Sequence, residues 1–145
     1  MIHWHIFEHL IKKENGFIKE GDRVIELGEQ FINIKQGWQH TKENPLLSPE
    51  FFPNIQVVSI DINPEYHALP LDLSKNISTK ERPEQGDVLT DFGTLEHVKS
   101  LYWGLKNSFN LLKIGGNAMH VNPLSGAMWR ITDFIILPLT SGKRL

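Results

Sequence analysis

The chain has 145 residues, a hydrophobic fraction of 40%, a charged fraction of 22% and a formal net charge of −2, as expected for one globular domain. The slight negative charge argues against a broad contact with nucleic acid, which needs a basic surface. Cysteine is absent, which excludes a disulfide framework and a thiolate metal site.

The first residues lack the basic leader and the uninterrupted apolar segment of a signal peptide. The longest late apolar run, "FIILPL", is far shorter than the roughly 20 residues of a membrane span. The sequence therefore indicates a cytoplasmic protein with no membrane segment. We expect a single domain over 1–145, with its core in 20–123 and a tail, 124–145, of undefined role.

In chain order, apolar residues at helical spacing predict an amphipathic helix over 3–14, ended by Asn15 and Gly16. A buried strand is expected over 23–27. The polar, proline-containing stretch 29–55 is expected to be mostly loop, with a short helix near 30–36. Residues 55–62 are rich in β-branched side chains and predict a second strand.

The second half of the chain predicts a short third strand over 68–74, a loop or broken helix over 75–86, and a fourth strand over 87–92. Thr94 is a suitable N-cap for the clearest helix, 95–112. The expected apolar face of this helix consists of Leu95, Val98, Leu101, Tyr102, Leu105, Phe109 and Leu112.

Residues 113–116 are expected to close the helix, and a fifth strand is expected over 117–121. Residues 131–140 could add one more strand, which Pro138 would confine to an edge or end.

Strands separated by helices or long crossings pair in parallel, so the pattern predicts an α/β fold with a Rossmann-like, mostly parallel sheet and flanking helices. The chain stops about 24 residues after the fifth strand, so we expect the sheet to be incomplete on its C-terminal side. The fifth strand would then lack a neighbour. A second copy of the chain or another partner chain could cover that edge.

Ligands of such sheets bind beyond the carboxyl ends of the strands. Asp61, Asp72 and Asp91 stand at the ends of successive predicted strands, and Gly28 follows the first one. A carboxylate after the second strand can accept hydrogen bonds from a ribose diol, and one after the third can accept from the amine of adenine. Each acid alone is more often a turn former or a helix cap, but their ordered occurrence at strand ends favours a ligand site.

Five motifs in this order resemble the class I S-adenosylmethionine-dependent methyltransferases, over about residues 20–123. "DRVIELGEQ" resembles the first motif, "VVSIDIN" the second and "LDLS" the third. "GDVLTDFGTLEHV" resembles the segment that lines the methionine end of the cofactor. "LLKIGGNAMHV" resembles the stretch that joins the following helix to the fifth strand.

The resemblance implies S-adenosyl-L-methionine as the cofactor and methyl transfer to an unidentified acceptor, such as a small molecule. Glu26 and Gly28 would lie near the methionine portion. Asp61 would hold the ribose hydroxyls, and Asp72 with Leu73 would contact the adenine. The groups that would face the sulfonium and the amino-acid end are Asp91, Phe92 and Gly93.

Glu96 and His97 begin the next helix, where the family often places residues near the acceptor. His97 could act as a general base, because imidazole titrates near neutral pH. Alternatively, it only caps or packs the start of the helix.

The first turn departs from the family's pattern, because Glu29 and Gln30 stand where further glycines are usual. The cofactor has no pyrophosphate, which is the group that makes a dinucleotide turn so demanding. Gln30 could hydrogen-bond a carboxylate or a ribose through its amide. Glu29 would either face solvent or meet the cofactor's ammonium group.

Two other functions stay open. A non-catalytic module of the same fold could bind the cofactor or support a partner chain. A nicotinamide-dependent oxidoreductase fits less well, because its glycines are absent and Asp61 lies 33 positions after Gly28, not about 20. His5 and His9 would share a helix face, but no third ligand is evident, so no metal site is predicted.

Overall fold

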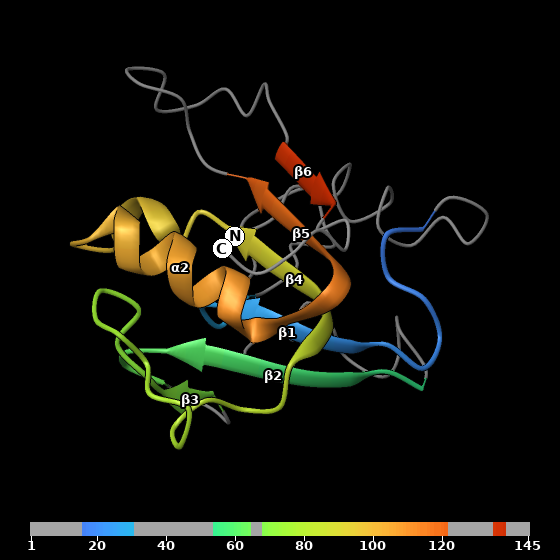
Figure 1. Ribbon diagram of the computed structural model, residues 1–145, viewed down its shortest axis with the longest axis horizontal. Coiled ribbons are helices and arrows are strands. Elements are labelled where there is room, and N and C mark those ends of the chain that lie inside the picture. Colours follow the sequence, from blue (N-terminus) through green and yellow to red (C-terminus); the bar gives the residue numbers. More distant parts are fainter. Residues whose placement is uncertain (1–15, 31–53, 65–67, 122–134, 139–145) are drawn as a thin grey trace, which may run out of the picture.

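The computed structural model describes residues 16–30, 54–64, 68–121 and 135–138. Its strands form one sheet in the order β3-β2-β1-β4-β5-β6 (Figure 1). The strands from β1 to β5 are parallel, and β6 is antiparallel to β5. A Rossmann-like, mostly parallel α/β sheet is therefore confirmed. The strands are β1 Arg23–Leu27, β2 Gln56–Asp61, β3 Leu69–Pro70, β4 Gly86–Phe92, β5 Leu112–Val121 and β6 Ile135–Pro138.

The single helix predicted over 95–112 is wrong, because the structure has two shorter helices. A 3-10 helix, η1, spans Leu95–His97, and the α-helix α2 spans Leu101–Leu111. Between them, Val98 and Ser100 have extended backbone angles. The Ser100 side chain accepts a hydrogen bond from the Trp103 N–H at 3.4 Å and so caps α2. Ser100, and not Thr94, is therefore the side-chain cap of the main helix.

The predicted apolar face of this helix is correct only in part: Leu95 and Leu112 lie in the core, and Val98 and Leu105 pack against it. Leu101, Tyr102 and Phe109 are 57%, 64% and 44% exposed. The buried positions are Gly104, Asn107, Ser108 and Leu111. A Cβ on Gly104 would lie 2.8 Å from Leu95 Cδ2, so the absence of a side chain lets the helix approach η1 closely.

The main core lies between the sheet and α2, which crosses one face of the sheet (Figure 1). Ile25 and Leu27 of the central strand β1 are completely buried there, together with Ile60, Leu89 and Leu111. Because side chains alternate along a strand, Glu26 points to the other face. The burial of β1 on both faces explains why its sequence after Arg23 is apolar apart from Glu26.

The ends of the sheet differ from the expectation. β3 has two residues where 68–74 was predicted, and β5 begins at Leu112, before the predicted 117. The expectation that the fifth strand lacks a neighbour is wrong, because β6 pairs with its residues Asn117 to His120. Pro138 ends this edge strand, as predicted. A partner chain stays a prediction, and at this side of the sheet it would meet β6.

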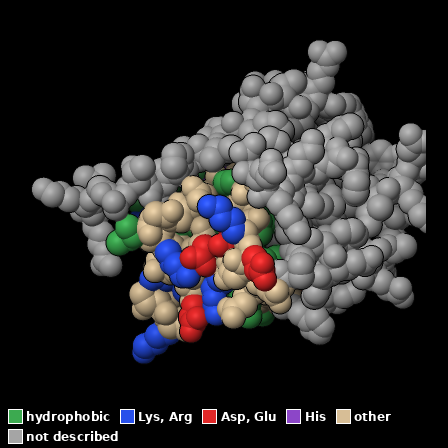
Figure 2. All heavy atoms as spheres, turned by 90° about the vertical axis from the view of Figure 1, so that its right-hand side faces the viewer, with side chains coloured by type: hydrophobic (Ala, Val, Ile, Leu, Met, Phe, Trp, Pro, Cys, Tyr) green, Lys and Arg blue, Asp and Glu red, His purple; other side chains and the backbone are tan. Residues whose placement is uncertain are grey.

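The amino ends of the strands carry a balanced set of charges. Figure 2 shows acidic and basic side chains interspersed on the described part of this face. Arg23 forms an ion pair with Glu84 at 2.8 Å, and Lys113 forms one with Asp87 at 2.7 Å. The Lys113 ammonium holds the pKa of Asp87 below its usual value. Within each of these two pairs the opposite charges neutralise each other.

Several predictions lie outside the described residues: the helices over 3–14 and 30–36, the paired histidines His5 and His9, and most of the tail 124–145. Among the helices that the structure describes, none is long and apolar enough to cross a membrane.

Candidate functional site

The carboxyl ends of β1, β2 and β4 lie side by side at one end of the sheet. This end is called the carboxyl edge below. The turn after β1 begins at Gly28, which has a φ of +76° and donates its N–H to the Ile60 carbonyl at 2.7 Å. The next N–H, that of Glu29, donates to Asp61 Oδ2 at 3.2 Å. The structure thus brings together the first turn and the acid at the end of β2, two features that the sequence predicted to share a site.

Asp61 is half-buried and holds the two chain segments in place. Its Oδ1 accepts the Asn63 N–H at 2.8 Å, while Oδ2 accepts from Glu29. Each carboxylate oxygen can accept two hydrogen bonds. Asp61 therefore keeps acceptor capacity for hydroxyl donors at this edge.

Glu29 extends the acidic edge towards β3. Its Oε1 accepts the Ala68 N–H at 3.1 Å, just before β3 begins. The Glu29 side chain is half-buried and links the turn after β1 to the start of β3. A contact between Glu29 and a ligand's ammonium group stays a prediction.

Asp72 and Leu73 follow β3 and differ in their surroundings. Asp72 accepts hydrogen bonds from the Ser74 hydroxyl and N–H and pairs with Lys75 at 2.9 Å. Chiefly because of the Ser74 hydroxyl, the pKa of Asp72 falls to about 2, so it is ionised at neutral pH. The Leu73 side chain is buried in the core, and its carbonyl accepts from Asn107 at 3.1 Å. Only backbone atoms of Leu73 could therefore meet a ligand.

Glu26 is a buried acid with one unsatisfied oxygen. Its Oε2 accepts from the Ser59 hydroxyl at 2.6 Å and from the Gln30 N–H at 3.4 Å. Its Oε1 has no hydrogen-bond partner in the part of the chain that the structure describes, and neither has Oγ1 of Thr90, its neighbour on β4. Burial raises the pKa of Glu26 to about 8, so its protonated form predominates at neutral pH.

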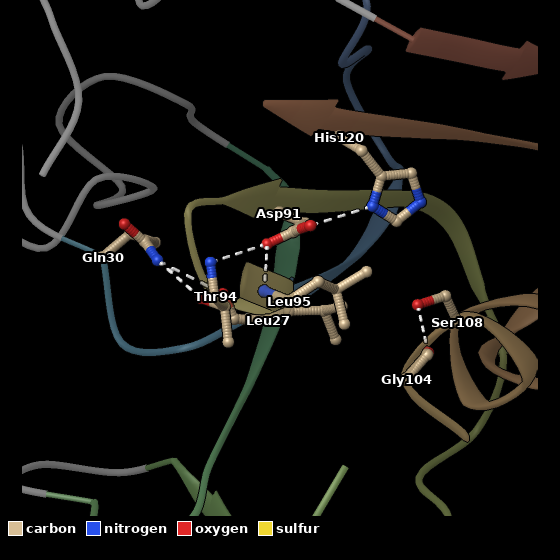
Figure 3. Close-up of polar contacts among 8 residues, drawn as sticks. All are labelled: Leu27, Gln30, Asp91, Thr94, Leu95, Gly104, Ser108 and His120. Carbon is tan, nitrogen blue, oxygen red and sulfur yellow. Dashed lines mark hydrogen bonds and ion pairs between the residues drawn. The ribbon is translucent and has the colours of Figure 1, made fainter. Parts of the chain in front are cut away.

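Gln30 is occupied by protein groups. Its Nε2 donates to the Leu27 carbonyl and to Thr94 Oγ1, both at 3.2 Å (Figure 3). Both amide hydrogens are therefore used inside the protein. A hydrogen bond from Nε2 to a ligand carboxylate would therefore require one of these two bonds to break.

Asp91 is completely buried, although the sequence predicted that it faces a ligand. Its Oδ1 accepts from the N–H groups of Thr94 and Leu95, at 2.9 and 3.2 Å. Its Oδ2 lies 3.0 Å from His120 Nδ1 (Figure 3). The carboxylate therefore caps η1 and pairs with His120 of β5. From its buried position it holds the start of η1 against the end of β5.

The functional side chains that the sequence analysis missed are Thr94 and His120. His120 is a buried polar residue one position before the end of β5, beside Asp91 in the register. A histidine among the buried residues at the carboxyl end of β5 is the signal that could have indicated an internal partner. The sequence predicts Thr94 only as a helix cap, yet its hydroxyl donates to the Leu27 carbonyl at 2.7 Å.

The remaining predicted residues follow β4. The Phe92 side chain is buried, and Gly93 has a φ of +80° that turns the chain into η1. His97 Nε2 lies 3.2 Å from Glu96 Oε1, and the His97 side chain is 80% exposed. His97 is therefore accessible at the edge and is not packed against the helix start. The described residues contain no cluster of three or more potential metal ligands.

Comparison with known proteins yields structural neighbours only. No family model and no curated protein matches the sequence. Two solved structures of the MycE methyltransferase from the mycinamycin biosynthetic pathway align with a TM-score of 0.50. One contains Mg and SAH, and the other also contains mycinamycin VI.

The identities are 19% and 20%, over 83% of this chain. The chain spans only about a third of the MycE length, 35% and 34% in the two structures. A likeness at this identity concerns the architecture, and it agrees with the strand order and the parallel pairing described above. The chain therefore has the fold of the class I methyltransferases.

Proposed function

We propose that this chain binds S-adenosyl-L-methionine at the carboxyl edge of its sheet and transfers the methyl group to an acceptor. One observation carries the proposal above all: the Glu29 N–H donates to Asp61, which joins the first turn to an acid at the end of β2. The five sequence motifs and the fold of the MycE structures, which were solved with SAH, support it.

The donor set at this edge suits that cofactor. Asp61 has acceptor capacity for ribose hydroxyls. Glu29, Asp61 and Asp72 place carboxylates at the ends of β1, β2 and β3, which favours a ligand that carries a sulfonium and an ammonium. Oε1 of Glu26, which has no partner among the described residues, is a further polar atom near the first turn.

The same features argue against a nicotinamide dinucleotide. Its pyrophosphate carries two negative charges and needs a glycine-rich turn that presents backbone N–H groups. Here the N–H groups of Gly28, Glu29 and Gln30 donate to Ile60, Asp61 and Glu26. The turn is therefore committed to protein acceptors, and the neighbouring acids would repel phosphate.

The cofactor supplies an electrophilic methyl group, which is displaced in line at the sulfonium as the acceptor attacks. Positioning supplies most of the rate in such a step. In our proposal Asp61 and Asp72 hold the nucleoside end. Exposed His97, beside Glu96, receives the proton that the acceptor loses.

A second candidate function is that of a non-catalytic module of the same fold. The internal use of Asp91 and Gln30 favours it, because two groups predicted to meet the cofactor are satisfied by the protein. Such a module would bind the cofactor, or support a partner chain, without methyl transfer.

Calorimetric titration of the full chain with S-adenosylmethionine, S-adenosylhomocysteine and NAD tests the proposal. We expect saturable micromolar binding of the first two and none of NAD. Binding without transfer of a labelled methyl group to any acceptor tried would favour the module. A folded chain that binds neither compound would overturn the proposal.

A further inference from the structure

Thr94 stands where the ends of β1 and β4 meet (Figure 3). We propose that Thr94 is a positioning residue that fixes the turn after β1, in place of the glycines that this turn lacks. The part of the inference that concerns the cofactor rests on the proposed function. The part that concerns the turn does not.

The Thr94 hydroxyl makes two hydrogen bonds to the turn. It donates to the Leu27 carbonyl at 2.7 Å and accepts from Gln30 Nε2 at 3.2 Å. Gln30 Nε2 also donates to Leu27, so the three groups close a small ring of hydrogen bonds. The ring joins Leu27, the last residue of β1, to the Gln30 side chain, so any separation of the two must break at least one of these bonds.

The fit at Gly28 shows how close this contact is. A Cβ at Gly28 would overlap Thr94 Oγ1 and lie 3.0 Å from Gln30 Nε2. In this chain, the missing side chain of Gly28 therefore makes room for Thr94. A turn with more glycines would be free to move at this point. This turn is instead packed against the Thr94 side chain.

Thr94 itself is held from the other side. Its N–H donates to Asp91, which is buried and pairs with His120 on β5. A threonine before a helix commonly uses its hydroxyl to cap that helix. The Thr94 side chain makes no cap hydrogen bond to η1. The Asp91 carboxylate caps η1 instead, which leaves the Thr94 hydroxyl for the turn.

The turn after β1 also positions the carboxyl edge at which the cofactor is proposed to bind. Gly28 and Glu29 donate their N–H groups to Ile60 and Asp61 at the end of β2. Loss of the Thr94 hydroxyl would leave the buried Leu27 carbonyl and the Gln30 amide short of a partner, and so loosen the turn. We expect weaker cofactor binding from this loosening, without any contact between Thr94 and the cofactor.

The test compares T94V, which loses the hydroxyl at nearly constant shape, with T94S, which keeps it. S108A is the control, because the Ser108 hydroxyl also donates to a backbone carbonyl, that of Gly104, at 2.8 Å and away from the turn. Urea unfolding measures stability. Hydrogen exchange of the Gly28 and Glu29 amides, without ligand, measures opening of the turn. Calorimetry measures the affinity for S-adenosylhomocysteine.

We expect T94V to speed exchange at both amides and to weaken S-adenosylhomocysteine binding by about tenfold. Both effects should exceed those of S108A when the two variants are compared at the same free energy of unfolding. T94S should restore both properties. If exchange at these amides is the same in T94V and S108A, Thr94 does not position the turn. Should T94V not fold, T94A with T94S decides in the same way. A wild-type chain that binds no S-adenosylhomocysteine overturns the proposed function, and the exchange result still decides the role of Thr94.

Discussion

Glu26 shows how the surroundings of one side chain affect the stability of the whole fold. Burial raises its pKa from 4.5 to about 8. The unfolded chain therefore loses this proton at lower pH than the folded protein. The contribution of Glu26 to stability is complete below about pH 4.5 and declines as the pH rises towards 8. The total decline is on the order of 5 kcal/mol.

We expect E26Q to remove this part of the pH dependence, because an amide does not titrate. Urea unfolding at intervals between pH 5 and pH 8 measures it as the difference in slope from the wild type. E20Q is the control, since Glu20 is an exposed acid. An unchanged slope in E26Q would show that Glu26 does not titrate in this window.

Asp61 carries the predicted contact to the ribose. We expect Asp61→Ala to weaken S-adenosylmethionine binding by about 1–3 kcal/mol, since ribose hydroxyls would lose a charged acceptor. Calorimetry measures the change. Asp22→Ala is the control, because Asp22 likewise accepts a backbone N–H, that of Lys19, but at the other end of β1. Equal affinities in the wild type and the Asp61 variant would remove Asp61 from the site.

Among the elements, α2 is joined to the loop between β3 and β4 by one buried side chain. Asn107 Nδ2 donates to the carbonyls of Leu73 and Lys75, at 3.1 and 2.7 Å, and its Oδ1 accepts the Ile77 N–H at 3.2 Å. These bonds give partners to backbone groups of the loop that its own turns leave unpaired. Asn107 therefore attaches α2 to this loop by hydrogen bonds, where an apolar side chain would do so by packing alone.

We expect Asn107→Ala to lower the free energy of unfolding by about 2–4 kcal/mol, because it leaves buried backbone groups without partners. Asn110→Ala is the control on the same helix: no described hydrogen bond involves the Asn110 side chain. Urea unfolding of both variants checks the difference. Equal losses would mean that the bonds of Asn107 add no stability.

Across the whole molecule, the order of the strands predicts an order of local stability. β1 and β4 have neighbours on both sides, whereas β3 and β6 are short strands at the edges. We expect amide exchange to be slowest in β1 and β4 and fastest in β3 and β6, because edge strands can open without unfolding the core. Hydrogen-exchange NMR measures this order. Slower exchange in β6 than in β1 would show that another chain covers the edge.

The sequence by itself determined the strands whose pattern is local. Residues 23–27 form β1 as predicted, and 55–62 contain β2, because runs of β-branched and apolar residues favour a buried strand wherever they pack. The parallel order follows from the long connections between these strands. The placement of Gly28 and Asp61 at one edge follows from that order, since the carboxyl ends of parallel strands lie together.

Only the tertiary structure decided how polar side chains are used. Helical periodicity counts apolar residues, so it selected Leu101 and Tyr102 for the buried face and missed Gly104 and Asn107, whose packing depends on distant partners. Asp91 likewise stands at a strand end, as the ligand pattern requires, yet its acceptors serve η1 and His120. A carboxylate or an amide can bind either a ligand or the protein's own groups. Which of the two it binds depends on the groups that the folded chain brings within hydrogen-bond distance of it.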